Sequence, residues 1–263
     1  MRVSRITIRS MAVLVLALGL CRPARAQTTG LIPLDDLGAG TYLGFPGGLY
    51  PGGTNTPPAG HASAALGLSL GIVPRNAAGD PDPNGWIGMI AVGMSNTTHE
   101  FGAFERNADA DTTRNARVVL VDTGLGGQTA ALIANPAAAY WTVMTQRLAA
   151  TGLAAAQVQV AWLKEADANP PNNFPLHAQA LREALKRICN NLHTKFPNIR
   201  LCFVSSRIYG GYSAQGTLNP EPQAYESGFS AKWLIEDPIS GGSHGTYGVN
   251  PPEPAEPLHT LGT

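Results

Sequence analysis

Charged and aromatic side chains are scarce in this sequence. Of its 263 residues, 14% are charged and 7% are aromatic, and 18 basic residues balance 18 acidic ones. A protein that binds nucleic acid or an anionic membrane surface usually carries a clustered excess of Lys and Arg. The composition therefore argues against both kinds of partner.

The sequence also lacks an apolar run long enough to cross a bilayer comfortably. The run MAVLVLALGL follows Arg2, Arg5 and Arg9 and precedes the small residues ARA, which end at Ala26. This order is typical of a secretory signal peptide. We therefore assign residues 1–26 to a signal peptide cleaved near Ala26 and expect a periplasmic or secreted protein, without stable membrane insertion after cleavage. LGLC resembles a lipoprotein cleavage box, but the bulky Leu20 stands where such a box has a small residue.

Cysteines are few once the signal is removed. The remaining 237 residues contain Cys189 and Cys202, and 13 basic side chains face 18 acidic ones, a formal charge of −5. In an exported protein such a pair can form a disulfide. The alternative is two buried free thiols, since cysteine is among the most buried residue types. Neither alternative makes them catalytic.

Histidines are also few, and their spacing does not suggest a metal site. His99-Glu100 lacks the second histidine of a zinc-binding helix. His177 and His193 are most simply surface residues of a helix, and His99 is a surface or packing residue. We expect no metal and no cofactor.

Residues 27–85 are rich in Gly and Pro, most densely in GFPGGLYPGGTNTPPAG. Their apolar residues follow neither the spacing of a helix nor the alternation of a strand for any length. We predict an irregular N-terminal arm there. Residues 238–263 are equally poor in periodicity and are predicted to form an irregular tail. One domain is expected between them, over residues 86–237.

Four short apolar runs within this domain predict buried strands: IGMIAV (87–92), RVVLVD (117–122), VQVAWL (158–163) and IRLCFVS (199–205). Continuous Val, Ile and Leu is typical of parallel strands covered on both faces. Between the strands, apolar residues with helical spacing predict one helix over residues 136–150 and another after NNFP. A further helix is expected to end near Ile235. The order predicts an α/β fold, a doubly wound parallel sheet in three α/β/α layers. Such sheets place their sites beyond the carboxyl ends of the strands.

The loops after the first three strands carry distinctive residues. In GMSN, residues 93–96, Ser95 stands at the junction of a predicted strand and a predicted helix. A nucleophile at this position would lie beside free backbone N–H groups that stabilise an oxyanion. Alternatively Ser95, Asn96 or Thr97 caps the helix. DTGLGGQT, residues 122–129, has three glycines in four positions and lets backbone approach a ligand closely. Its spacing does not fit the G-x-G-x-x-G of dinucleotide-binding loops. WLKEAD ends the third strand with Lys164 and Glu165, which alternatively form a salt bridge.

In this order the three loops resemble the conserved blocks of the SGNH hydrolases, the GDSL-like esterases and lipases. VGMSN is similar to the G-D-S block, with Met94 in place of Asp, and Lys164 stands where the family has Asn. The resemblance covers residues 86–205. It implies a flavodoxin-like fold and a serine esterase acting on a carboxylic or carbohydrate acyl ester. Ser95 would be the nucleophile, with Gly127 and Lys164 at the oxyanion and Asn96 beside the substrate.

The family's catalytic histidine lies in a D-x-x-H motif near the C-terminus, which this chain lacks. EPLH imitates it and makes His259 the candidate base, with His244 as a second option; alternatively the chain is truncated or frame-shifted before the true base. Tyr209 and Tyr212 either line a substrate pocket or pack over the sheet edge. A different class of function also fits, a non-catalytic secreted or surface protein that binds ligands on a hydrolase-like scaffold. The oligomeric state is left open.

Overall fold

The computed structural model describes residues 30–206 and 221–240, together with the backbone of residues 259–262. The predicted signal peptide lies outside the described residues. So do Tyr209, Tyr212 and His244, three of the predicted site residues.

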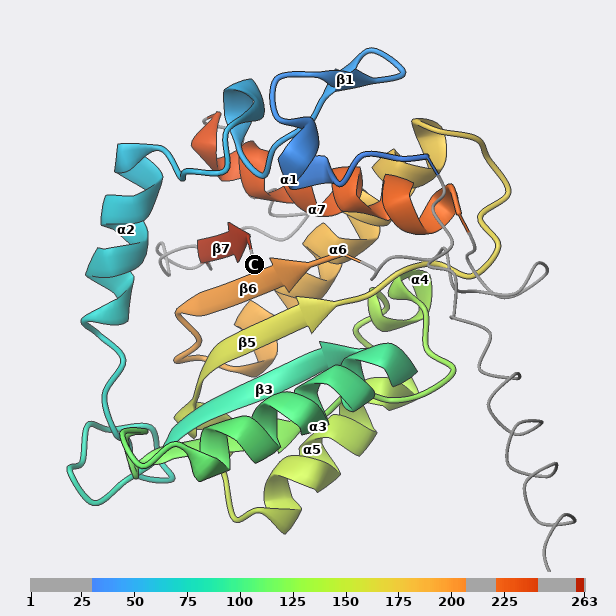
Figure 1. The fold of residues 1–263 in the computed structure, drawn as a ribbon. Helices are drawn as coiled ribbons and strands as arrows, with labels where there is room; N and C mark the ends of the chain where they lie inside the picture. Colours follow the sequence, from blue (N-terminus) through green and yellow to red (C-terminus); the bar gives the residue numbers. More distant parts are fainter. Residues whose placement is uncertain (1–29, 207–220, 241–258, 263) are drawn as a thin grey trace, which may run out of the picture.

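A parallel sheet forms the centre of the protein, with strand order β4-β3-β5-β6-β7 (Figure 1). The four apolar runs form its first four strands, each within two residues of the predicted bounds. The strands are β3 (Ile87–Gly93), β4 (Val118–Asp122), β5 (Val158–Lys164), β6 (Leu201–Ser205) and β7 (His259–Gly262). All neighbouring strands are parallel, as predicted from their continuous apolar character.

Helices flank the sheet on both faces, which is consistent with the predicted three layers. Figure 1 shows α3 (Ser95–Ala110) in front of the sheet, where Phe101 stacks on Trp162 of β5 with 6.1 Å between ring centroids. Alternate strand residues, including Ile90 and Leu163, face the other layer and join its core. That layer contains α4 (Ala130–Ile133), α5 (Ala139–Ala150) and α6 (Leu176–Lys195).

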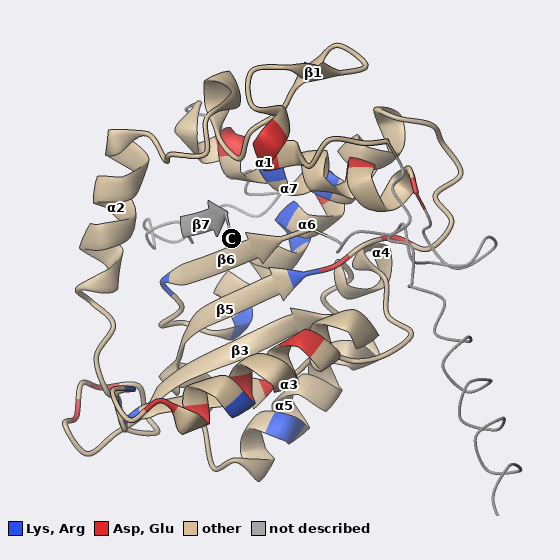
Figure 2. Cartoon of the chain, in the orientation of Figure 1, with Lys and Arg blue, Asp and Glu red and all other residues tan. Residues whose placement is uncertain are grey.

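The long helix α6 forms where the apolar spacing predicts it. Leu181, Leu185, Ile188 and Leu192, spaced by four, three and four residues, are all buried in the core. Helix α7 (Gln223–Ile239) packs against α6 and extends the predicted last helix by one turn. Acidic and basic residues are interspersed along the described elements (Figure 2).

The N-terminal arm is more ordered than predicted. It contains α1 (Leu34–Leu37), the hairpin β1 (Thr41–Tyr42) and β2 (Phe45–Pro46), a short 3₁₀ turn η1 (Pro51–Gly53) and α2 (Ala59–Ser69). The prediction of an irregular arm was wrong for α2. That helix buries only His61 among its residues and leaves most of its surface exposed. It therefore has no apolar stripe from which a helix could be predicted.

The C-terminal tail also differs from the prediction, since residues 259–262 form strand β7 beside β6. Four residues carry too little periodicity to predict a strand from sequence.

Polar contacts to the buried side chains of Glu226 and Lys232 attach the arm to the C-terminal helices. The Tyr42 hydroxyl donates to Oε1 of Glu226 at 2.7 Å, and Oε2 of Glu226 lies 2.6 Å from Nε2 of His177. Nearby, the Lys232 ammonium donates to the Tyr50 carbonyl at 3.1 Å. His177 is 5% exposed, so its prediction as a surface residue was wrong. The first turn of α6 is covered because α7 presents a carboxylate to it.

Candidate functional site

The carboxyl ends of β3 and β5 meet at the topological switch point of the sheet. From β3 the chain leaves through α3 on the front face, whereas from β5 it leaves toward α6 on the opposite face. Gly93, the last residue of β3, is paired with Lys164, the last residue of β5. In doubly wound sheets, ligands bind at such a point, beyond the carboxyl ends of the strands.

Ser95 is the first residue of α3 and is exposed at this point. The N-cap position belongs to Met94, which has an extended backbone and makes no side-chain cap hydrogen bond. Ser95, Asn96 and Thr97 all lie within the first turn of the helix, so the alternative that one of them is the N-cap is wrong. The Thr97 hydroxyl donates to the Lys164 carbonyl of β5 instead. Ser95 itself is exposed at the N-terminus of a 16-residue helix.

The glycine-rich loop after β4 lies beside Ser95. The Leu125 N–H donates to the Gly93 carbonyl at 2.8 Å, which holds this loop against the end of β3. A Cβ atom on Gly126 would lie 3.6 Å from the Cβ of Ser95. The glycine beside Ser95 is thus Gly126, one residue before the Gly127 that the family resemblance assigns to the oxyanion. Gly127 is exposed, with a left-handed φ of +78° and open space where a side chain would project.

The end of β3 is held tightly from both faces. The Gly93 N–H donates to the hydroxyl of Tyr140 at 3.1 Å. Burial raises the pKa of the Tyr140 phenol, which therefore stays neutral. On the other face, a side chain at Gly93 would overlap the Lys164 carbonyl oxygen and the Thr97 hydroxyl, at a φ of +152°. Only glycine fits this junction.

Lys164 is placed at the switch point but is engaged by a carboxylate. Its side chain is 2% exposed, and its ammonium lies 2.6 Å and 2.5 Å from the two carboxylate oxygens of Glu100 on α3. Glu165, the residue that follows the last residue of β5, is buried as well. Its carboxylate accepts the Ala166 N–H at 2.9 Å, and its charge contributes to the raised pKa of Tyr140. Glu100 was not predicted, since nothing in the sequence marks it as the partner of a strand residue 64 positions later.

Asp167 is a second residue that the sequence analysis missed. Its Oδ1 accepts the Ala131 N–H at 3.1 Å, while the Ala130 N–H donates to the Ala166 carbonyl at 3.1 Å. These two bonds tie the first turn of α4 to the segment after β5. Burial raises the pKa of Asp167. The sequence places Asp167 just after a predicted strand, in WLKEAD, which marks it as a candidate site residue. Its hydrogen bond to Ala131 could not be predicted, because it depends on how α4 packs.

The structure does not bring His259 to Ser95. His259 begins β7 and is paired with Leu201, the first residue of β6. Leu201 is in turn paired with Val160 of β5, and Val160 with Met89 of β3. Gly93 lies four residues further along and three strands away, so the two backbones are separated by about 19 Å. His259 sits at the amino end of the sheet, which overturns its assignment as the base. EPLH therefore shares with the D-x-x-H motif only the spacing between its acidic residue and its histidine.

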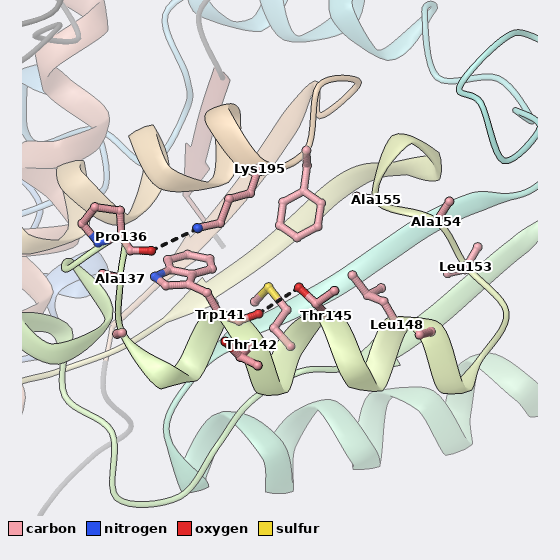
Figure 3. A pocket seen from close by; sticks show the side chains of 14 residues that line it. Pro136, Ala137, Trp141, Thr142, Thr145, Leu148, Leu153, Ala154, Ala155 and Lys195 are labelled. Carbon is pink, nitrogen blue, oxygen red and sulfur yellow. Dashed lines mark hydrogen bonds between the residues drawn. The ribbon is translucent and has the colours of Figure 1, made fainter.

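A cavity of about 460 Å³ lies elsewhere, between α5 and the end of α6. Figure 3 shows Trp141 and Thr145 of α5 on one side and Lys195 on the other, with the Lys195 ammonium 3.1 Å from the Pro136 carbonyl. Its lining includes no residue from the loops after β3, β4 or β5. It offers no nucleophile paired with a base, so we do not regard it as the reactive site.

Among the residues that the structure describes, no group of three His, Cys, Asp or Glu side chains is arranged to hold a metal ion. Within the same part of the chain, no helix combines the length and the apolar character needed to cross a membrane. Cys189 and Cys202 are buried free thiols. The second of the two cysteine alternatives is thus the one that the structure shows.

Comparison of the chain with protein-family models, with curated proteins and with solved structures gave no match. The resemblance to the SGNH hydrolases therefore depends on the quoted loop residues alone. What the structure adds is independent of that resemblance: an exposed serine, a helix N-terminus and a glycine loop at one switch point.

Proposed function

We propose that this protein is an exported ester hydrolase of the SGNH type in which Ser95 is the nucleophile. The observation that carries the proposal is the exposed Ser95 at the first position of α3, with the loop at Gly126 beside it. A helix N-terminus offers free N–H groups and a partial positive charge, which stabilise a developing anion. The substrate class is a carboxylic ester, including acyl groups on carbohydrate.

The reaction would proceed through an acyl-enzyme. The Ser95 oxygen attacks the ester carbonyl, and the negative charge on the carbonyl oxygen is accepted by N–H groups of the first turn of α3 and of the loop at Gly126 and Gly127. The alcohol leaves with a proton, and water then releases the acid. Asn96, half-buried in the same turn, lies beside this path.

A serine needs a proton acceptor to react at neutral pH. His99 follows Ser95 by four residues on α3 and is exposed, so the two residues share a helix face. His244 lies outside the described residues. Replacing each by Gln and measuring ester turnover identifies the acceptor: only loss of turnover in one variant, with the fold retained, assigns it.

A second candidate function is a non-catalytic binding protein on the same scaffold. Two observations favour it: Met94 replaces the acidic residue of the G-D-S block, and His259 lies at the opposite end of the sheet from Ser95.

Labelling with a fluorophosphonate probe separates the two functions. An enzyme predicts labelling of the wild type that disappears in Ser95→Ala. Ser63→Ala, which alters an exposed serine on α2, is the matched control and should label like the wild type. A folded wild type that does not label favours the binding protein. Export is tested separately, by an N-terminus at Gln27 in protein recovered outside the cytoplasm.

A further inference from the structure

Helix α3 is attached to the end of β5 at two points, one helical turn apart. Thr97 is fully buried, and its hydroxyl donates to the Lys164 carbonyl at 2.6 Å. Three residues later, Glu100 holds the Lys164 ammonium with both carboxylate oxygens. Residues three apart share a face of a helix. A single residue of β5 therefore binds one face of α3 within the two turns that begin at Ser95.

The environment of the Lys164 ammonium is unsuited to a substrate oxyanion. With a side chain only 2% exposed, Lys164 has lost most of its hydration, which is costly unless an opposite charge lies close by. Glu100 supplies that charge while remaining 34% exposed itself. An oxyanion approaching the same ammonium would meet the negative charge of the Glu100 carboxylate at hydrogen-bonding distance from it. Electrostatic repulsion would oppose this approach.

We infer that Lys164 is a positioning residue, which acts through Glu100 and Thr97 to fix the first turns of α3 and with them the Ser95 hydroxyl. This role differs from the donation to the oxyanion that the family resemblance implies for this position. The inference rests on the proposed function, because a fixed serine affects a rate only if Ser95 reacts.

A double-mutant cycle tests the inference. The four proteins are the wild type, Glu100→Gln, Lys164→Met and the double variant, and the readout is the second-order rate of fluorophosphonate labelling. Positioning predicts that each single variant labels about tenfold more slowly, and that the double variant is no slower than either, because both changes break the same link. The matched control is Asp109→Asn. It removes the ion pair with Arg114 at the other end of α3, with 2.8 Å between the charged atoms, and should label at the wild-type rate.

An oxyanion donor would behave differently. Removing the Glu100 charge would then leave the ammonium free for the substrate, so Glu100→Gln would label at the wild-type rate or faster while Lys164→Met lost labelling. That result would overturn the inference.

Amide hydrogen exchange in the same folded variants gives a readout independent of chemistry. Positioning predicts faster exchange at residues 98–102 in both single variants, and no change there in Asp109→Asn. If the wild type is not labelled at all, the proposed function fails and exchange alone decides the positioning role. Unchanged exchange at residues 98–102 in both single variants would refute it.

Discussion

The hydroxyl of Tyr42 provides the most quantitative test of how the N-terminal arm is held. Tyr42→Phe removes the donor to Glu226 and leaves a carboxylate that is 4% exposed with one interaction fewer. A hydrogen bond to a charged group contributes about 1.5–3 kcal/mol. Because Tyr42 is only half-buried, water can partly replace it, and we expect a loss of about 1–2 kcal/mol in the free energy of unfolding.

The ring contacts should survive this substitution. Tyr42 packs against Phe174, Tyr225 and Phe229 with centroid distances of 5.3, 5.0 and 5.9 Å. Phenylalanine retains this packing, so the loss reports the hydroxyl alone. For a chain of this length, the expected fall in melting temperature is about 2–8 °C.

The assay is urea unfolding followed by circular dichroism, with Tyr225→Phe as the control. Tyr225 belongs to the same aromatic cluster, but its hydroxyl makes no hydrogen bond to the part of the chain that is described. We expect Tyr225→Phe to change stability by less than about 0.5 kcal/mol. Equal losses in the two variants, or no loss in Tyr42→Phe, would refute the assigned role of the Tyr42–Glu226 bond.

The pH dependence gives a second check on the same bond. Burial, together with the hydrogen bond to Glu226, raises the pKa of Tyr42 above its ordinary value near 10. Folding therefore favours the neutral phenol. The stabilisation is fully present below pH 10 and declines as the pH rises above that value, where the unfolded chain ionises first. The difference between the wild type and Tyr42→Phe should shrink in alkaline buffer.

Three further predictions concern the strand ends and the core. Gly93→Ala should lower the free energy of unfolding by at least about 2 kcal/mol in urea denaturation, because the new Cβ would overlap the Lys164 carbonyl; wild-type stability would contradict the close approach. Ellman's reagent should modify no thiol in the native protein and two after denaturation and signal removal. The hydrogen bond with Cys189 and burial raise the pKa of the Cys202 thiol. Rapid native labelling would contradict this burial. Asp167→Asn should become more stable relative to the wild type as the pH rises from below 3.8 toward neutrality. Burial raises the Asp167 pKa, so ionisation in that range destabilises the folded wild type. Parallel pH profiles would contradict it.

Local sequence patterns determined the elements that position the candidate site. Continuous apolar runs predicted the strands β3, β4, β5 and β6. Apolar residues spaced three or four apart predicted α6: Leu181, Leu185, Ile188 and Leu192. Because predicted strands and helices alternate along the chain, a parallel sheet with helices on both faces was expected. Ser95 and the glycine-rich loop could be expected at the same edge, because the carboxyl ends of parallel strands lie together.

Only the tertiary structure decided which side chains meet at that edge. The partner of Lys164 is Glu100 of another element, His177 is buried because Glu226 of α7 reaches it, and His259 is distant from Ser95 because β7 joins the sheet beside β6. Short or uniformly small segments such as β7 and α2 carry no periodic signal of their own. Strand order, register and charge pairing depend on residues far apart in the chain, so no local pattern contains them.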